Sequence, residues 1–348
     1  QRKVLPDSNG KIIKEDILRP FGVTSIEKLF PATPLFEELD KITHREQYLN
    51  IVDSIKTADK PTIIQAEGGV GKSVFSQYVL QVLPEGSLGI AYDCFGSGKY
   101  RSRSKPRHRH RDALVQIANE LASLGHCDSM AIKDTTQEND IVHGFLTRIE
   151  SSIKSLKQRV ASAQLYILID AADNAEMAAQ EFGDSCFAHE LLKEDYPQDC
   201  KLVYLCRPER THLLKPSSSI SIFNLQPFSK EETFENLKKY FQEVNENQAL
   251  EFHRLTSGNP RVQMNAISAG HASINELLEF LGPSGTSVEQ QIEDQLNAAV
   301  NKIKNNLTSE YQSSVDKICK GLASLPPNIP LEVLAKASEI SIEEVKSF

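Results

Sequence analysis

The stretch Pro61-Thr-Ile-Ile-Gln-Ala-Glu-Gly-Gly-Val-Gly-Lys-Ser-Val-Phe75 decides the fold of this chain. Its apolar start, residues 62–66, predicts a short buried strand, and residues 73–83 carry apolar side chains at helical spacing. A strand, a glycine-rich turn, a Lys-Ser pair and a helix in this order are typical of the phosphate-binding loop (P-loop) of nucleoside triphosphatases. The first glycine of that motif is replaced here by Ala66.

The residue types of the P-loop explain how it holds a nucleotide. Its glycines let backbone N–H groups face one point, where the start of the next helix adds the positive end of its dipole. Lys72 can reach the β- and γ-phosphates, and the Ser73 hydroxyl can hold Mg²⁺. We therefore expect the chain to bind ATP or GTP together with Mg²⁺. The residues expected around the phosphates are Glu67, Gly68, Gly69, Val70, Gly71, Lys72, Ser73 and Val74.

A second landmark is the run Leu165-Tyr-Ile-Leu-Ile-Asp-Ala-Ala-Asp-Asn174. An apolar run that ends in an acid predicts a buried parallel strand with a carboxylate at its C-terminal tip. Behind a P-loop, this position supplies the acid that holds the Mg²⁺ shell, and we assign that role to Asp170. We expect Asp173 either to orient the attacking water or to contact a neighbouring subunit.

Three further apolar runs predict strands, which together with the two above form a five-stranded parallel sheet in an α/β P-loop fold. The added strands cover residues 88–95, 201–207 and 219–225. Arg207 lies at the tip of one of them, where it could sense the γ-phosphate; a surface salt bridge is the alternative interpretation.

Capping residues, glycines and prolines, together with helical periodicity, predict the domain organisation. Ser229 and Glu232 form a capping box, and Gly258-Asn-Pro260 provides an N-cap followed by an N1 proline, whose rigid ring suits packing against a purine. The expected parts are a linker at 1–40, a P-loop nucleotide-binding domain at 41–227, an all-α domain at 228–305 and the truncated start of a winged-helix domain at 306–348. We expect the chain to be a piece of a longer protein whose effector domain is missing.

Composition limits the possible function classes. The net charge of −8 argues against general coating of nucleic acid, although it allows a local basic patch. The six cysteines show no C-x-x-C spacing, which favours reduced thiols in a cytoplasmic protein. No apolar run approaches membrane-spanning length, so we expect no membrane association.

One basic segment, residues 99–111, contains seven lysines and arginines between small residues, proline and histidine. Such a run predicts either a solvated loop or a contact with phosphate, nucleic acid or a subunit. Tyr100 is its only aromatic side chain, whereas single-stranded DNA binding favours stacking aromatics. We therefore favour a contact between identical copies over DNA binding.

The order of these features resembles the STAND class of signalling ATPases, which includes NACHT and NB-ARC proteins. The features are Thr43-His-Arg-Glu46, the P-loop, the Asp170 strand, Arg207, Gly258-Asn-Pro260 and the C-terminal helices. The stretch Ala91-Tyr-Asp-Cys-Phe-Gly, together with Arg107-His-Arg-His-Arg-Asp-Ala-Leu-Val-Gln-Ile-Ala-Asn-Glu-Leu121, is similar to the ATPase core of the bacterial antiviral STAND (Avs) proteins.

The resemblance implies an ATP-driven switch that forms a homo-oligomer, for example a tetramer, and so activates an attached effector such as a nuclease. A missing C-terminal sensor would detect a phage protein, and nucleic acid would be contacted through the absent effector. By position, Arg45 and Pro260 would flank the base. NACHT proteins commonly have Asp-Glu where this chain has Asp173-Asn174, which implies slow ATP hydrolysis. The alternatives are a DNA-binding AAA+ initiator or loader with a winged helix, and a STAND transcription regulator.

Overall fold

A computed structural model describes residues 18, 23, 25–36, 45–282, 297, 300–301, 304–305, 309–325 and 330–346. The chain forms two compact units, residues 1–225 and 226–348. Thr43, His44 and most of residues 283–308, which fall in the expected all-α domain and at the start of the expected winged-helix domain, lie outside the described residues.

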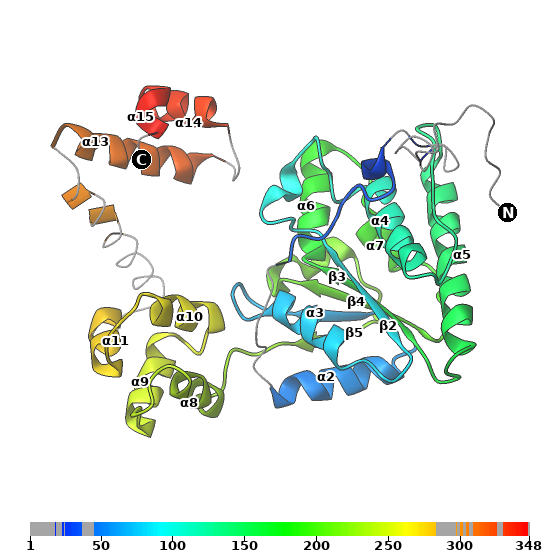
Figure 1. Ribbon diagram of the computed structural model, residues 1–348, viewed down its shortest axis with the longest axis horizontal. Coiled ribbons are helices and arrows are strands. Elements are labelled where there is room, and N and C mark those ends of the chain that lie inside the picture. Colours follow the sequence, from blue (N-terminus) through cyan, green and yellow to red (C-terminus); the bar gives the residue numbers. More distant parts are fainter. Residues whose placement is uncertain are drawn as a thin grey trace, which may run out of the picture. The chain divides into compact units, whose positions relative to one another are not determined.

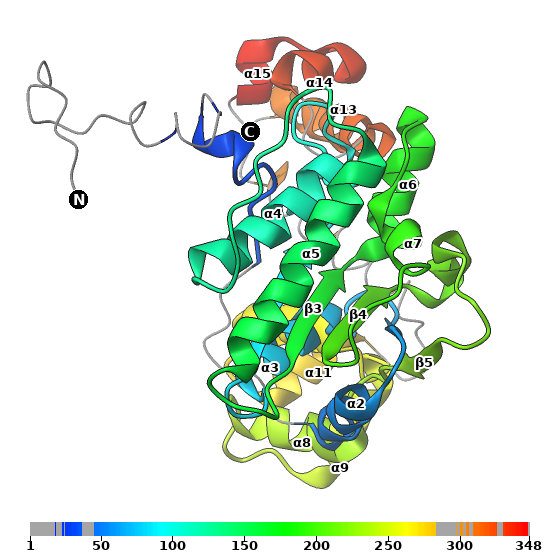
Figure 2. The same cartoon turned by 90° about the vertical axis from the view of Figure 1, so that its right-hand side faces the viewer.

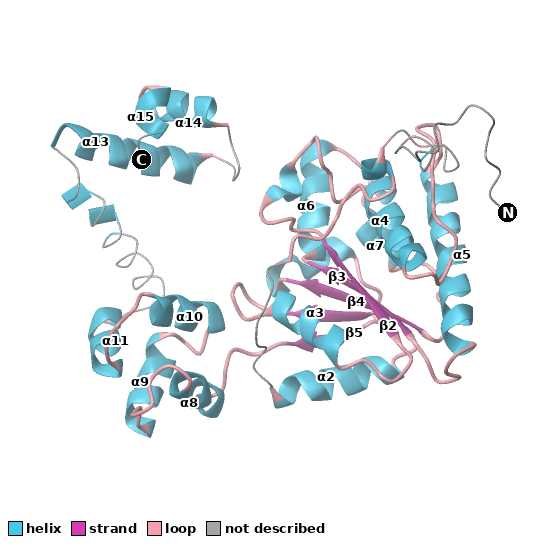
Figure 3. Ribbon diagram, in the orientation of Figure 1, coloured by secondary structure: helices cyan, strands magenta, loops and turns pink. Residues whose placement is uncertain are grey.

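The first unit is built on a five-stranded sheet in the order β2-β3-β4-β1-β5 (Figures 1 and 3). Every neighbouring pair of strands is parallel, so all carboxyl ends lie at one edge of the sheet. The strands are β1 (Thr62–Gln65), β2 (Leu88–Asp93), β3 (Leu165–Asp170), β4 (Cys200–Cys206) and β5 (Ser221–Asn224). The predicted α/β fold with a five-stranded parallel sheet is confirmed.

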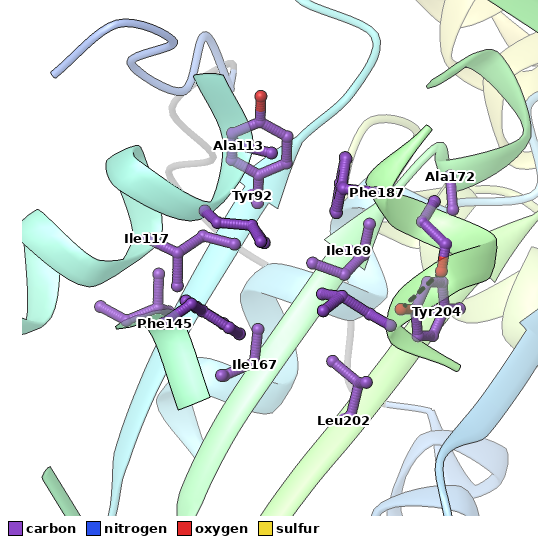
Figure 4. Packing of buried hydrophobic residues seen from close by; sticks show 14 of the residues in the cluster. Tyr92, Ala113, Ile117, Phe145, Ile167, Ile169, Ala172, Phe187, Leu202 and Tyr204 are labelled. Carbon is purple, nitrogen blue, oxygen red and sulfur yellow. Dashed lines mark hydrogen bonds between the residues drawn. The ribbon is translucent and has the colours of Figure 1, made fainter. Parts of the chain in front are cut away.

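Helices cover both faces of this sheet, which explains why the central strands are apolar along their whole length. Alternate residues of β3 enter two separate cores: Ile167 and Ile169 pack in one, Tyr166 and Leu168 in the other. Helices α4 (His110–Ser123) and α5 (Glu138–Lys157) run side by side over the first core (Figure 2). Side chains of α6 (Ala172–Phe182) and α7 (Phe187–Leu191) complete it (Figure 4). The second core lies under α2 (Glu46–Thr57) and α3 (Lys72–Gln81).

Residues 25–36, which fall in the predicted linker, pack on the rest of the first unit and include the 3₁₀ turn η2 (Ile26–Lys28). The backbone N–H of Ala32 donates to Gln116 Oε1 at 3.0 Å. Asn119 Nδ2 donates to the carbonyl of Leu29 at 2.7 Å. Because Gln116 and Asn119 are buried on α4, these bonds fix the segment to the surface of that helix.

The interpretation of the basic segment 99–111 as a solvated loop is wrong for its second half. Arg107 is 7% exposed, and its guanidinium donates to the carbonyls of Asp93 (2.8 Å) and Thr33 (2.7 Å). A Cβ added at Gly96, whose φ is 57°, would lie 2.3 Å from Arg107 Nε. Arg107 is therefore a structural residue of its own domain and is not available to a neighbouring copy.

The other side chains of this segment divide between buried and exposed positions. His108 and His110 are fully buried and lie 2.9 Å from Asp184 and 2.8 Å from Glu190. Several further side chains pair within the domain, in the ion pairs Arg101–Glu181 and Arg109–Asp112 and in the bond from Arg111 to the Asp134 carbonyl. Lys99, Arg103 and Lys105 are exposed. The 3₁₀ turn η3 (Lys99–Arg101) lies within the exposed part.

The second unit is helical wherever it is described. Its elements are α8 (Lys230–Lys238), α9 (Glu246–Leu255), α10 (Pro260–Ser268), α11 (Ile274–Leu281), α13 (Ser309–Ser324), α14 (Leu331–Ser338) and α15 (Ile342–Lys346). The capping box of Ser229 and Glu232 is confirmed at the start of α8. The last three helices fit the start of a winged-helix domain, but the described part of 309–346 holds no strand, and the winged helix stays a prediction. Among the described helices, none is both long and apolar enough to cross a membrane.

Replacing Arg107 with methionine should destabilise the protein, because methionine keeps the length of the side chain but removes its donors. The carbonyls of residues 32, 33 and 93 would lose their partners, a loss of about 2 kcal/mol that lowers the melting temperature by roughly 4–8 °C. The matched control is Lys105→Met, which removes an exposed charge of the same segment. Equal melting temperatures of the two variants would contradict the structural role of Arg107.

Candidate functional site

The P-loop follows β1 directly and wraps toward the start of α3. Gly69 and Gly71 have φ values of 81° and 109°, which residues other than glycine rarely adopt. A Cβ added at Gly71 would also lie 3.2 Å from the hydroxyl of Tyr48. Ala66 does not have a positive φ, and its N–H donates to the carbonyl of Cys206 at 3.1 Å. Alanine is therefore tolerated at the first position of the motif, whereas the later glycines are required by the backbone.

Lys72 folds back over the loop. Its Nζ donates to the carbonyl oxygens of Ala66 (2.5 Å) and Glu67 (3.1 Å). Burial lowers the pKa of Lys72, and the nearby carboxylates of Asp173 and Asp170 oppose this shift. A half-buried ammonium group that is held by carbonyls can turn toward a stronger anionic partner such as a phosphate.

Ser73 and Asp170 meet although they come from different strand–helix units. Ser73 Oγ donates to Asp170 Oδ2 at 2.5 Å, which joins the start of α3 to the tip of β3. Asp170 is 2% exposed, and burial raises its pKa to about 6, with a further contribution from Asp93. The next residue, Ala171, has a strained φ of 54°.

This pair of residues fits Mg²⁺. Hydroxyl and carboxylate oxygens are the hard ligands that Mg²⁺ prefers. The second carboxylate oxygen of Asp170, Oδ1, is buried and has no hydrogen-bond partner among the described residues. A buried acceptor without a partner is costly, and a cation at this position would remove that cost.

Asp173 lies on the first turn of α6 and is 1% exposed. Burial raises its pKa, and the strongest opposing charge is Arg210. Arg210 Nη1 lies 3.4 Å from Asp173 Oδ2, an ion pair that the sequence did not reveal.

Arg207 lies directly after β4, and its side chain is 44% exposed. A Cβ added at Gly68 would lie 3.9 Å from Arg207 Nη2, so the guanidinium reaches the P-loop. Glu209 Oε1 lies 3.9 Å from Arg207 Nη1, at the limit of an ion pair. The predicted position of Arg207 beside the phosphates is thus compatible with the structure.

The two residues predicted to flank the base lie in different units. Arg45 is the N-cap of α2, 2% exposed, with its guanidinium 5.1 Å from the centre of the Tyr48 ring. Since the Tyr48 hydroxyl is close to Gly71, Arg45 belongs to the surroundings of the P-loop. Pro260 is at N1 of α10 in the second unit, where the Asn259 side chain accepts from the N–H groups of residues 261 and 262.

The remaining predicted positions form the loop itself. Glu67 and Gly68 are exposed, Val74 is partly buried, and Val70 is 1% exposed in the core under α2 and α3. Val70 therefore anchors the P-loop to the core under α2 and α3.

Two further charged residues at this edge of the sheet are not among the residues predicted from the sequence. Asp93 ends β2 as Asp170 ends β3, and the two residues are register partners in the sheet. The same signal, an apolar run ending in an acid, could have identified Asp93. Arg210 follows Arg207 by one turn of η4 (Pro208–Leu214), and no pattern in the sequence distinguishes it.

Residues 38–207 match the family model described as Nephrocystin 3, N-terminal. This range contains the P-loop, Asp170, Asp173 and Arg207. The match, together with the sheet order and the loop geometry, supports the STAND-class P-loop NTPase that the sequence predicts. No curated protein sequence matches the chain.

Solved structures with a similar fold include a Walker-type ATPase of Pyrococcus abyssi, which is 17% identical, with 91% of this chain and 93% of that chain covered and a TM-score of 0.43. A STAND protein with a tetratricopeptide repeat sensor from Pyrococcus horikoshii is 15% identical, with 89% and 40% covered and a TM-score of 0.40. A chain of Drosophila ORC bound to DNA is 14% identical, with 86% and 80% covered and a TM-score of 0.43. At such identities and TM-scores these likenesses carry no conclusion about function.

Replacing Asp170 with asparagine should stabilise the protein without nucleotide at neutral pH. The folded-state pKa of about 6 lies above the ordinary value of 3.8, so the folded state resists ionisation of this carboxyl group. The resulting penalty is absent below about pH 4 and complete above about pH 6, where it reaches up to about 3 kcal/mol.

The gain in melting temperature over the parent should therefore grow between about pH 4 and about pH 6. Asp53→Asn, which changes an exposed carboxylate on α2, should show no such growth. A loss of stability in Asp170→Asn at neutral pH would contradict the assignment of Asp170 as a functional residue whose buried carboxylate destabilises the protein without nucleotide.

Proposed function

We propose that this chain is the nucleotide switch of a STAND protein, which binds ATP with Mg²⁺ at the P-loop and hydrolyses it slowly. The observation that supports this best is the contact between Ser73 and Asp170. It brings a hydroxyl group and a buried carboxylate to the start of α3, and one oxygen of that carboxylate has no partner within the described ranges. An ordinary glycine-rich turn would not need these two side chains together.

The roles of the other residues follow from their positions. Lys72 would exchange the carbonyls of Ala66 and Glu67 for the β- and γ-phosphate oxygens. Arg207, whose guanidinium already reaches Gly68, would bind the γ-phosphate and so distinguish ATP from ADP. Mg²⁺, when bound, neutralises charge on the phosphate oxygens and is held by Ser73 and Asp170.

Hydrolysis is slow in this proposal because of Asn174. A carboxamide cannot accept a proton from water at neutral pH, whereas a glutamate at this position could act as a general base. A long-lived ATP state suits a switch, because the bound conformation persists until the slow chemical step ends it.

We further propose that ATP binding drives self-assembly, for example into a tetramer, and thereby activates an effector in an antiviral response. A phage protein would act as the trigger through a sensor outside this chain, and an effector such as a nuclease would contact nucleic acid. The support is the resemblance of residues 91–121 to the Avs ATPase core. In this chain, that stretch includes the Asp93–Arg107 contact that holds residues 32–35, so the resemblance includes buried structural residues.

A DNA-binding AAA+ function has less support. Four of the arginines in segment 99–111 already have partners within the first unit: Arg101, Arg107, Arg109 and Arg111. Three exposed cations remain in that segment, too few for the steep salt dependence that several phosphate contacts give. A strong, salt-sensitive affinity of the purified chain for DNA would reverse this ranking.

Replacing Lys72 with alanine should lower the affinity for ATP by at least about tenfold, because a positive charge on the phosphates is lost. Equilibrium dialysis with labelled ATP measures the affinity, and far-UV circular dichroism checks that the fold is intact. Lys60→Ala is the matched control: it removes an exposed lysine beside the opposite end of β1. Equal ATP affinity in Lys72→Ala and the parent would disprove the site.

The parent chain should hydrolyse ATP with a turnover well below the median for enzymes, about 10 per second.

A further inference from the structure

Arg210 connects two buried side chains at the start of α6. Its Nη1 lies 3.4 Å from Asp173 Oδ2 and 3.4 Å from Asn174 Oδ1. Asp173 is 1% exposed and Asn174 is 9% exposed, while the Arg210 side chain is 27% exposed. One guanidinium nitrogen therefore holds both residues from the neighbouring 3₁₀ turn η4.

The chemistry of arginine fixes the orientation of Asn174. A guanidinium group only donates hydrogen bonds, so the atom of Asn174 that faces it must be the carbonyl oxygen. The NH₂ group of the same amide then lies on the other side of Cγ, away from Arg210. Asn174 is thus set as a hydrogen-bond donor toward its remaining surroundings.

Asp173 belongs to the phosphate side of the site. The carboxylate of Asp173, like that of Asp170, raises the pKa of Lys72, which would bind the phosphates. Lys72 and Arg207 both lower the pKa of Asp173. The residues held by Arg210 are therefore neighbours of the groups assigned to the γ-phosphate.

We propose that Arg210 is a positioning residue for ATP hydrolysis, which holds Asp173 as a hydrogen-bond acceptor for the attacking water and Asn174 as a donor to the γ-phosphate end of the nucleotide. This inference rests on the proposed ATPase function. In the step, the water oxygen forms a bond to the γ-phosphorus, and the bond from that phosphorus to the β–γ bridging oxygen breaks. ADP leaves, and both protons of the water end on the released phosphate, one on the attacking oxygen and one on a second phosphate oxygen.

Arg210 and Arg207 then have separate tasks although they are one turn apart. Arg207 is 44% exposed and reaches the P-loop, so its loss should weaken ATP binding. Arg210 pairs with Asp173 and Glu209 and holds Asn174, so its loss should slow the chemical step and leave binding unchanged.

The test compares ATP affinity and single-turnover hydrolysis for the parent chain, Arg210→Met, Arg210→Lys and a control. Arg210→Met should bind ATP within about twofold of the parent and hydrolyse it at least about tenfold more slowly. Arg210→Lys should recover part of the rate, because an ammonium group can still pair with Asp173. The control is Arg101→Met, which removes the ion pair to Glu181 at the other end of α6 and should hydrolyse at the parental rate.

Several results would overturn the inference. These are a parental rate in Arg210→Met, an equal loss of rate in Arg101→Met, and a loss of ATP affinity that accounts for the loss of rate. If Arg210→Met does not fold, Arg210→Lys decides: a folded lysine variant with the parental rate contradicts the role. A parent chain that fails to bind ATP would instead contradict the proposed function itself.

Discussion

The hydrogen bond from Ser73 to Asp170 is the contact on which the proposed site depends. β1 and β3 are not neighbours in the sheet, because β4 lies between them. The bond therefore holds the P-loop helix across a strand and brings the two candidate Mg²⁺ ligands within 2.5 Å. It requires the parallel order of the strands, the glycines that turn the loop, and the strained Ala171 that starts α6. Each of these features helps to bring Ser73 and Asp170 together at the carboxyl edge of the sheet.

Two buried carboxylates at this edge differ in their hydrogen bonding, which distinguishes a structural acid from a functional one. Asp93 accepts hydrogen bonds from the N–H groups of Leu35, Phe95 and Gly96, so both of its oxygens have partners. Asp170, its register partner, has one oxygen without a partner in the described part of the chain and a pKa raised to about 6. A fully bonded acid stabilises the fold, whereas an acid with an open oxygen is costly to the protein alone and suits a ligand. The difference assigns Asp93 to the attachment of residues 32–35 and Asp170 to the nucleotide.

The sheet was predictable from sequence because its strands are short apolar runs with no competing helical pattern. The P-loop and Asp170 were predictable because their chemistry is tied to fixed spacing. Helix α6 was not predicted, since Ala171-Ala-Asp-Asn174 follows the strand without a cap or a break. Arg107 was misjudged because charge suggests exposure, and only the folded chain shows the carbonyls of residues 32, 33 and 93 that surround it. Arg210 depends on the approach of η4 to α6, a long-range contact that local sequence cannot reveal.

The central claim is that Ser73 and Asp170 hold Mg²⁺ on ATP. Calorimetric titration of the parent chain with ATP, first with Mg²⁺ and then with excess chelator, tests it most directly. We expect one binding site per chain and an affinity that falls by at least about tenfold, or about 1.4 kcal/mol, when Mg²⁺ is removed. An ATP affinity that does not change on removal of Mg²⁺, or no binding under either condition, would contradict it.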